Sequence, residues 1–290
     1  MSTSTEPRAD SKNRRAALYR LLAWLSPSFP VGAFSYSHGL EAAAAAEAVY
    51  DRATLQSWIA AIVAQGSGRI DADILCDSYR AAEAGDLAAL DAVNRRGLAF
   101  RGTAELALEA GQQGEAFLNT CLAAWPDPFL AQWAAEKNPS PPFWGERERP
   151  TPKAWEGEVG IGKRSGIPHL TPALSAPGGG EGARELAAIS DGVCHSAAFG
   201  AAAARAGIAL EDALVGYLHA FAANLMSAGL RLGLIGQTDG QRILAALEPI
   251  VTRAAQATLV RDPADFGAAT FAVDLASMAH ETQYSRLFRS

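Results

Sequence analysis

Positions 34–38 hold the side chains of this sequence that are best equipped for chemistry. The segment Phe34-Ser35-Tyr36-Ser37-His38 brings two hydroxyls, a phenol and an imidazole together. A catalytic serine of the familiar kind sits on a G-x-S-x-G elbow after a strand, and this segment has neither feature. Two interpretations stay open: the segment contacts a partner, or it is an ordinary junction between a loop and a helix with one aromatic ring in the core.

The remaining histidines are candidates for metal binding. A metal site needs several converging ligands, and the five histidines form no H-x-x-H or H-E-x-x-H pattern. Cys194 and His195 are adjacent and would point about 100° apart on a helix, which favours a buried thiol beside a polar residue. We expect His219, on an apolar helix, to be hydrogen-bonded in the interior, and His280 with Glu281 to form a surface pair.

Two other patterns resemble catalytic motifs, and we interpret neither as one. The stretch GEVGIGKRS, residues 157–165, nearly matches the phosphate-loop pattern, but Arg164 replaces the metal-binding hydroxyl and proline-rich sequence flanks it. Asp71, Asp73 and Asp77 are predicted to lie on a solvated helix face. The residues therefore favour a protein that is not an enzyme.

The C-terminal stretch HETQYSRLFRS has the composition of a contact surface. It ends the chain with Tyr284, Arg286, Phe288 and Arg289, and protein interfaces are enriched in arginine and aromatic residues. The alternative is a frayed tail, because a terminus that is not tied to the core is usually disordered.

The elements that must position these residues are predicted to be helices. Alanine, leucine, glutamate and arginine dominate, 49% of the residues are hydrophobic, and β-branched residues seldom alternate with polar ones. The sequence therefore predicts an all-α fold, a single-domain helical bundle. Its first amphipathic helix carries Leu18, Leu21, Leu22 and Leu25 on one face and ends before Pro27, and a second helix is expected to begin at about Ser35.

The later helices follow from the same periodicity. Thr54 is the expected N-cap of LQSWIAAIVAQ, a helix that continues across Gly66 and Gly68 into DADILCDSYRAAEA. Thr238 or Asp239 is expected to cap a helix in the second half. The other helical stretches are DLAALDAVNRR, AELALEAGQQGEAFLNTCLAAW, ISDGVCHSAAFGAAAARAGI, LEDALVGYLHAFAANLMSAGLRLGLIGQ, GQRILAALEPIVTRAAQATL and FAVDLASMAHETQYSRLFRS.

Two segments are not expected to belong to the bundle. Residues 1–14 form a polar tail that we predict to be disordered. Residues 138–182 are rich in proline and glycine and have no helical or alternating period, which predicts a long disordered, flexible insertion. The helical domain then spans 15–290, interrupted by 138–182.

Charge and cysteine content limit the partners and the compartment. The net charge is -6, and 25 basic residues are scattered among 31 acidic ones, so nucleic acid is a poor candidate ligand. Three widely spaced cysteines indicate neither a disulfide framework nor a zinc ribbon and favour a reducing cytoplasm. No uninterrupted apolar run approaches the ~20 residues of a membrane span, so we expect a soluble protein.

Three long stretches carry a family resemblance. LLAWLSPSFPVGAFSYSHGLE, YLHAFAANLMSAGLRLGLIGQTDGQRILAALEP and ASMAHETQYSRLFRS resemble, in this order, the N-terminal signature, the central helix and the C-terminal motif of the urease accessory protein UreF family. The resemblance covers about residues 15–130 and 186–290. It departs at 138–182, where the family usually has a short link between helices.

The resemblance implies an all-α, dimeric, cytoplasmic chaperone. It would bind the accessory protein UreD, also called UreH, recruit the GTPase UreG and help deliver nickel to apo-urease, with no stable cofactor or metal of its own. The residues that the resemblance assigns to the UreD face are Gly32, Phe34, Ser35, Tyr36 and Gly39, together with His280, Glu281, Gln283, Tyr284, Arg286, Leu287 and Phe288. Those assigned to the region that meets UreG are Arg231, Gln237, Thr238, Asp239 and Gln241.

The resemblance also implies a proposed role in modulating GTP hydrolysis, for which Arg231 and Arg286 are only candidates. Two other hypotheses remain beside the scaffold. One is a metal-binding protein or hydrolase that uses His38, His195, His219 or His280. The other is a purely structural helical dimer whose original function the insertion has disabled.

Overall fold

The computed structural model describes residues 6–137 and 192–289, and within them the regular structure is helical and no strand occurs, which confirms the predicted all-α fold. The helices before the gap are α1 Glu6–Trp24, η1 Ala33–Ser35, α2 Leu40–Ala45, α3 Arg52–Gln65, α4 Ser67–Ala84, α5 Leu87–Ala99, α6 Ala104–Ala124 and α7 Pro128–Lys137. Those after it are α9 His195–Arg205, α10 Leu210–Arg231, α11 Gln237–Leu259, η3 Pro263–Asp265 and α12 Phe271–Glu281.

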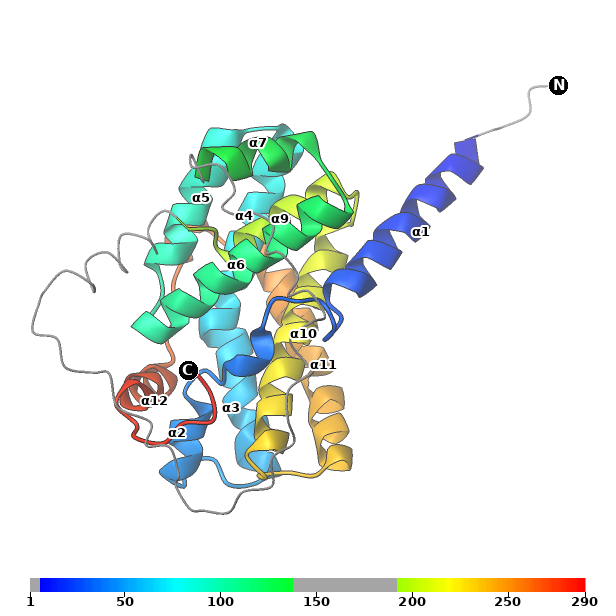
Figure 1. Cartoon of the computed structure of the whole chain (residues 1–290). Coiled ribbons are helices and arrows are strands. Elements are labelled where there is room, and N and C mark those ends of the chain that lie inside the picture. The colour runs from blue at the N-terminus through cyan, green and yellow to red at the C-terminus, as the bar shows by residue number, and fades with distance from the viewer. Residues whose placement is uncertain (1–5, 138–191, 290) are drawn as a thin grey trace, which may run out of the picture.

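Helices α4 and α9 form the centre of the molecule. Helices α5 and α6 pack against this pair, and α3, α10 and α11 also pack against α4, with α10 and α11 running side by side (Figure 1). Buried apolar residues from 6–137 and from 192–289 join in one continuous core. Side chains that are at most 1% exposed come from five of these helices: Leu75, Phe117, Phe199, Leu214 and Ile243.

Two glycines allow the central helices to approach closely. A Cβ added at Gly200 of α9 would lie 2.4 Å from the carbonyl oxygen of Leu75 in α4. A Cβ added at Gly114 of α6 would lie 1.8 Å from the carbonyl oxygen of Val193, directly before α9. Because these neighbours are backbone atoms that cannot rotate away, alanine does not fit at either position without movement of a helix.

The caps differ in detail from the sequence prediction. Helix α3 begins after Asp51, whose carboxylate accepts a hydrogen bond from the backbone N–H of Thr54 at 2.8 Å, while the Thr54 hydroxyl accepts from the N–H of Asp51. Thr54 is therefore the third residue of a capping box, and its prediction as the N-cap is wrong. The predicted continuation of this helix is also wrong, since α3 ends and α4 begins on either side of Gly66.

Helix α11 also begins earlier than predicted. Its N-cap is Gly236, and Thr238 and Asp239 lie in its first turn instead of capping it. A carboxylate in the first turn is favourable there because the helix dipole places partial positive charge at this end.

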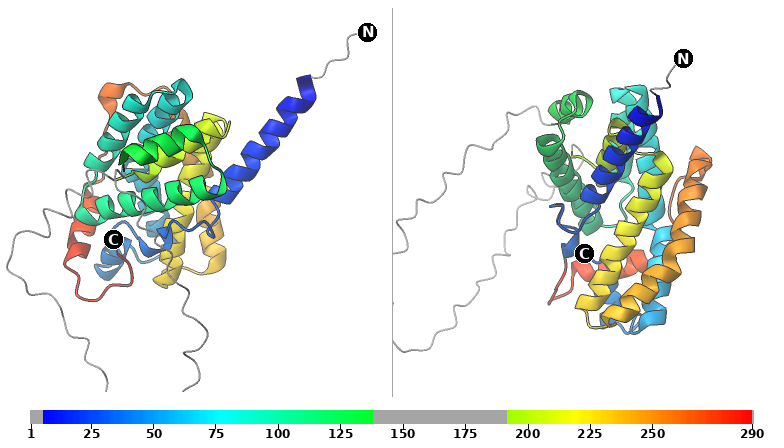
Figure 2. Two further views of the ribbon diagram at one scale, coloured as in Figure 1. Left: turned by 45° about the horizontal axis from the view of Figure 1, so that its top comes forward. Right: turned by 90° about the vertical axis from the view of Figure 1, so that its right-hand side faces the viewer.

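Helix α1 extends from the rest of the fold, and its N-terminal end points away from the bundle in Figure 1 and in the left view of Figure 2. Its last turns contact the core, where Leu21 and Trp24 are buried. Leu18 and Leu22 are exposed, so the prediction that they share a buried face with Leu21 is wrong for this chain alone. The helix reaches back to Glu6, into the range that the sequence assigns to a polar tail.

Some sequence predictions lie outside the described residues, among them the insertion at 138–182 and the near match to a phosphate loop at 157–165. One described helix, α10, is long and apolar enough to cross a membrane, whereas the sequence predicted no segment of that kind. Half of its apolar stretch is buried inside this structure, where it packs against α3, α4, α9 and α11. A core helix of a globular protein has the same length and composition.

Candidate functional site

The opening segment, residues 26–41, connects α1 to α2 and holds the first group of predicted contact residues. The helix expected at about Ser35 begins only at Leu40, because Gly32 and Gly39 adopt left-handed backbone with φ of 76° and 72°. At Gly39 a Cβ would also meet the backbone of α12 at 2.6 Å. Glycine therefore permits both the turn and the contact between α2 and α12.

The C-terminal residues fold back onto this segment and bind the carboxylate of Glu41. Its two oxygens accept hydrogen bonds from the backbone N–H groups of Leu287 at 2.7 Å and Phe288 at 2.9 Å. The N–H of Arg289 donates to the carbonyl oxygen of Ser35 at 2.7 Å. The end of the chain is thus tied to the fold, and the alternative of a frayed tail does not hold for residues 287–289.

His280 also contacts Glu41 and joins it to α6. It is fully buried, with Nε2 3.2 Å from a Glu41 oxygen and Nδ1 2.8 Å from a Glu105 oxygen of α6. The predicted surface pair of His280 with Glu281 is wrong, because Glu281 instead accepts the N–H of Ala104 at the start of α6. Arg286 adds an ion pair to the second oxygen of Glu105 at 2.6 Å.

Arg231 at the end of α10 closes the arrangement. Its guanidinium donates to the carbonyl oxygen of Phe34 and lies 4.3 Å above the centre of the Phe288 ring. The joined face formed by residues 32–41, Arg231 and residues 280–289 is called the composite surface below. Three stretches far apart in the sequence build it.

The other predicted UreG-side residues, Gln237, Thr238, Asp239 and Gln241, begin α11. Asp239 pairs there with Arg242 at 2.9 Å and with Arg52 of α3 at 3.7 Å. No contact described here joins Asp239 to the composite surface. Arg231 is therefore the member of this predicted group that the structure brings to the composite surface.

The composite surface separates anchoring residues from exposed ones. Tyr36 is 2% exposed, and its hydroxyl donates to Gln112 at 2.7 Å, so it holds the segment in place. Burial raises the pKa of Tyr36, which keeps the phenol protonated as a donor. Phe34 at 68%, Leu287 at 62% and Tyr284 with its whole side chain exposed project outward.

Helix α12 also exposes apolar side chains. Phe271, Leu275 and Met278 recur at i, i+4 and i+7 and are 79%, 66% and 49% exposed. The opposite face of α12, including Val273, Ser277 and His280, is buried. An apolar stripe on the solvent side of an amphipathic helix marks a surface for contact with another molecule.

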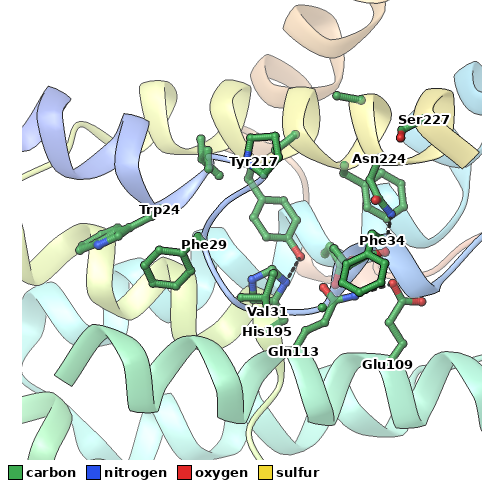
Figure 3. A pocket seen from close by; sticks show the side chains of 18 of the residues that line it. Trp24, Phe29, Val31, Phe34, Glu109, Gln113, His195, Tyr217, Asn224 and Ser227 are labelled. Atoms are coloured by element: carbon green, nitrogen blue, oxygen red, sulfur yellow. Dashed lines mark hydrogen bonds between the residues drawn. The ribbon is translucent and has the colours of Figure 1, made fainter. Parts of the chain in front are cut away.

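Beneath the opening segment lies a cavity of about 560 Å³ (Figure 3). Trp24 lines it from the end of α1, and Tyr217 lines it from α10. Phe29 and Phe34 line it from the opening segment. Figure 3 shows Glu109 and Gln113 of α6 and His195 at the start of α9 on the other side of the space. Asn224 of α10 donates to the carbonyl oxygen of Ala33 at 2.8 Å and so holds the opening segment over the cavity.

A buried ion pair also borders this cavity and corrects a sequence prediction. Asp71 and Asp73 of α4 are 5% and 7% exposed, so they do not belong to a solvated face. Asp71 binds the guanidinium of Arg101 at 2.7 Å and the Ser196 hydroxyl at 2.8 Å, and Asp73 binds Arg261 at 2.8 Å. Asp77 is 36% exposed at its side chain and also pairs with an arginine.

In both ion pairs, burial and the charged partner shift the pKa in opposite directions. Burial by itself would lower the pKa of Arg101, but the neighbouring groups, with Asp71 first among them, together raise it by more, so the guanidinium stays charged. Burial raises the pKa of Asp73 above its usual value although Arg261 opposes this shift. These carboxylates join helices and need no catalytic explanation.

Four of the five histidines lie within the described residues, and each has a different environment. His38 has left-handed backbone with φ of 53°, and its ring contacts Glu109 at 3.1 Å and the Ser67 hydroxyl at 3.2 Å, so both nitrogens are engaged. Burial lowers the pKa of His195 to about 4, and its Nδ1 lies 3.5 Å from the Tyr217 hydroxyl. His219 is exposed on α10, so the prediction of an interior histidine is wrong.

The expectation for Cys194 agrees with the structure. Its side chain is fully buried beside Ser196 and accepts from Arg101, and the other two cysteines are buried and free as well. Among residues 6–137 and 192–289, no three His, Cys, Asp or Glu side chains are arranged to share a metal ion.

Sequence patterns missed the residues that hold the composite surface together. Glu41, Glu105 and Gln112 lie in ordinary helical sequence, and their partners are more than 70 residues away along the chain. Only the side-by-side placement of hydroxyls, aromatic residues and glycines between 32 and 39 marked this region. The missing signal is long-range pairing, which single-sequence periodicity does not contain.

The fold defines the class: within the described residues this is an all-helical protein, and it exposes apolar side chains at Phe34, Tyr284 and Leu287. A family model described as UreF matches residues 49–248. The chain belongs to the UreF family.

Curated relatives agree over almost the full chain. A urease accessory protein UreF of Granulibacter bethesdensis is 41% identical over 275 residues, which cover 95% of this chain and 94% of the relative. A urease accessory protein UreF of Rhodopseudomonas palustris strain BisA53 is 39% identical over 290 residues and the whole of both chains. One from Bradyrhizobium sp. strain ORS 278 is 38% identical over 284 residues, or 98% and 96% of the two chains.

Proposed function

We propose that this chain is a non-enzymatic scaffold in the maturation of urease, which binds UreD through the composite surface and then recruits UreG. Nickel passes to apo-urease through the resulting assembly, with no resident metal on this chain. The observation that carries the proposal is the exposed aromatic surface at Phe34 and Tyr284, built on anchors that are themselves buried. Such a surface is pre-organised, so less conformational entropy is lost when a partner binds.

The division of the composite surface suggests which residues the partner touches. Phe34, Tyr284 and Leu287 are exposed and serve as contacts, whereas Tyr36 and His280 position them from below. The apolar stripe of α12 continues the same interface, and large aromatic side chains are common hot spots of binding energy. We assign this face to UreD.

The polar residues that begin α11 are assigned to UreG. Gln237, Thr238 and Gln241 lie near Asp239, whose carboxylate already pairs with Arg52 and Arg242. Arg231, the remaining member of this group, contacts Phe34 and Phe288 at the composite surface. Neither Arg231 nor Arg286 is assigned to GTP hydrolysis.

The proposed setting is a homodimer in the cytoplasm. The three free, buried cysteines suit a reducing compartment. The exposed face of α1, with Leu18, Tyr19 and Leu22, is apolar surface that an oligomer or partner would cover. The competing idea of a hydrolase or metal protein finds no support in His38 or His280, since both ring nitrogens of each are already engaged.

The test is complex formation with point variants. The full chain is co-expressed with UreD and UreG, and the complex is measured by size-exclusion chromatography. Phe34→Ser is expected to lower the amount of complex with UreD at least tenfold, because an exposed anchor is lost while the fold is kept. Tyr50→Ser removes an equally exposed aromatic residue, 63% against 68%, outside the composite surface and should leave the complex unchanged.

The outcomes separate the proposal from its alternatives. Equal complex formation by wild type, Phe34→Ser and a Leu287→Ser variant would show that the composite surface is not the UreD site. If the full chain forms no complex at all, the scaffold proposal itself is wrong. A truncation before His280 is less informative, because it would also remove the buried partner of Glu41 and Glu105.

A further inference from the structure

The cavity beneath the opening segment has the features of a binding site for a small molecule. Its volume of about 560 Å³ lies within the range of ligand pockets in proteins. Residues from the opening segment, α4, α6, α9 and α10 all line it, so its shape depends on the whole fold and not on one loop. Neither the composite surface nor the proposed scaffold role requires this cavity.

The polar groups of the cavity leave one carboxylate oxygen without a partner. Glu109 is 7% exposed, and its Oε1 accepts from Gln113 at 2.8 Å and lies 3.1 Å from His38 Nε2. Its Oε2 is buried and has no hydrogen-bond partner among the described residues, although it also lies 3.1 Å from His38 Nε2. A buried acceptor without a donor is costly, so this oxygen is where a ligand donor gains most.

The charges around the cavity favour a cation. Asp71 and Arg101 neutralise each other, and no other arginine or lysine lines the space. His38 lies within hydrogen-bond distance of the Ser67 hydroxyl and of Glu109, and His195 is neutral at pH 7 because burial lowers its pKa to about 4. Glu109 is therefore the carboxylate of the cavity that has no arginine or lysine partner among the lining residues.

The walls favour an organic cation over a bare metal ion. Trp24, Phe29, Phe34, Tyr217 and Phe221 surround the space with aromatic faces, which attract cations and bury apolar groups. A metal ion would instead need several convergent ligands, and the described residues contain no group of three that could hold one.

We propose that this cavity binds a small organic cation of the amidinium or guanidinium class, with its N–H groups on Glu109 and its apolar body between Tyr217 and Phe29. Two parallel N–H groups match the geometry of a carboxylate, and a charged hydrogen bond in a water-poor site is stronger than one at the surface. The ligand sits directly under the opening segment. Its binding therefore stabilises the loop that carries Phe34.

The test uses benzamidinium as the probe and the full-length protein. We expect isothermal titration calorimetry to give a dissociation constant of about 1 mM or tighter, with benzamide, the uncharged analogue, at least tenfold weaker. Glu109→Gln keeps an acceptor for His38 but removes the charge, and it should weaken benzamidinium binding at least tenfold. Glu115→Gln, an exposed residue of the same helix, is the matched control and should bind as the wild type does.

A second variant addresses the cavity without touching its carboxylate. Ser227→Phe places a ring into the space from α10 and should abolish benzamidinium binding while circular dichroism and the melting temperature show a folded protein. The proposal is wrong if the wild type does not bind benzamidinium, or if Glu109→Gln binds it as tightly. It is equally wrong if Ni²⁺ binds in a Glu109-dependent way and benzamidinium does not.

Discussion

The packing of α6 and α9 and the composite surface use opposite means to hold chain segments together. In the former, Gly114 brings two backbones to a distance that leaves no room for a methyl group, and the core residues around it are fully buried. In the latter, Glu41 and Glu105 collect N–H groups and a histidine while aromatic rings remain in solvent. Close packing gives stability, whereas polar anchoring leaves the apolar side chains free for a partner.

The largest expected effect is in the close packing. Gly114→Ala should lower the free energy of unfolding by about 3 kcal/mol, because the new methyl group meets a backbone carbonyl. Gly111→Ala lies one turn earlier in the same helix, where nothing is within 4 Å of the added atom. It should raise stability by about 0.5–1 kcal/mol through helix propensity.

Urea denaturation measures both glycine variants. Equal effects of the two substitutions would contradict the described contact between α6 and the residues before α9. Because both positions share one helix and one substitution, differences in helix propensity cancel in the comparison.

At the composite surface we expect a smaller effect on the free energy of unfolding, together with a large increase in hydrogen exchange at the chain end. Glu41→Ala removes the acceptor of two backbone N–H groups and one contact of His280, and it should lower the free energy of unfolding by about 2 kcal/mol. The amides of Leu287 and Phe288 should lose their protection from hydrogen exchange, while amides of α4 keep theirs.

Glu83→Ala, an exposed change on α4, serves as the control for the Glu41 variant and should alter neither measurement. Persisting protection of Leu287 and Phe288 in Glu41→Ala would mean that other contacts suffice to hold the chain end.

At neutral pH the smallest effect on stability is expected at His195 in the core, and this effect grows as the pH falls. The pKa of His195 is lowered by burial to about 4, whereas an unfolded histidine titrates near 6.5. Between these values the unfolded chain binds more protons than the folded chain, so the histidine destabilises the fold as the pH falls from about 6.5 to 4. His195→Gln should therefore flatten the loss of stability in this range and have little pH-dependent effect above pH 7.

The measurement for His195 is the free energy of unfolding in urea at several pH values. His219→Gln changes an exposed ring that borders the same cavity and should leave the pH profile unaltered. If His195→Gln left the pH dependence of the unfolding free energy unchanged, groups other than His195 would cause the loss of stability in acid.

Much of the fold could be predicted because helices are encoded locally. Periodic apolar residues predict the helices around Leu75, Phe117 and Leu214. Glycine together with aromatic residues indicates that the opening segment is a candidate contact region. The errors arose where a partner lies far away in the chain. Asp71 and His280 have the sequence environment of surface residues, yet both are buried because Arg101 and two glutamates meet them in the folded state.

The sequence by itself determined the helical class, the family resemblance and the segments that carry exposed aromatic residues. Only the tertiary structure decided that the first and last of these segments form one surface around Glu41, and that a cavity lined by the buried carboxylate of Glu109 lies beneath it. The reason is physical: helix periodicity depends on neighbours within about four residues, whereas the burial and pairing of a charge depend on side chains that only folding brings near.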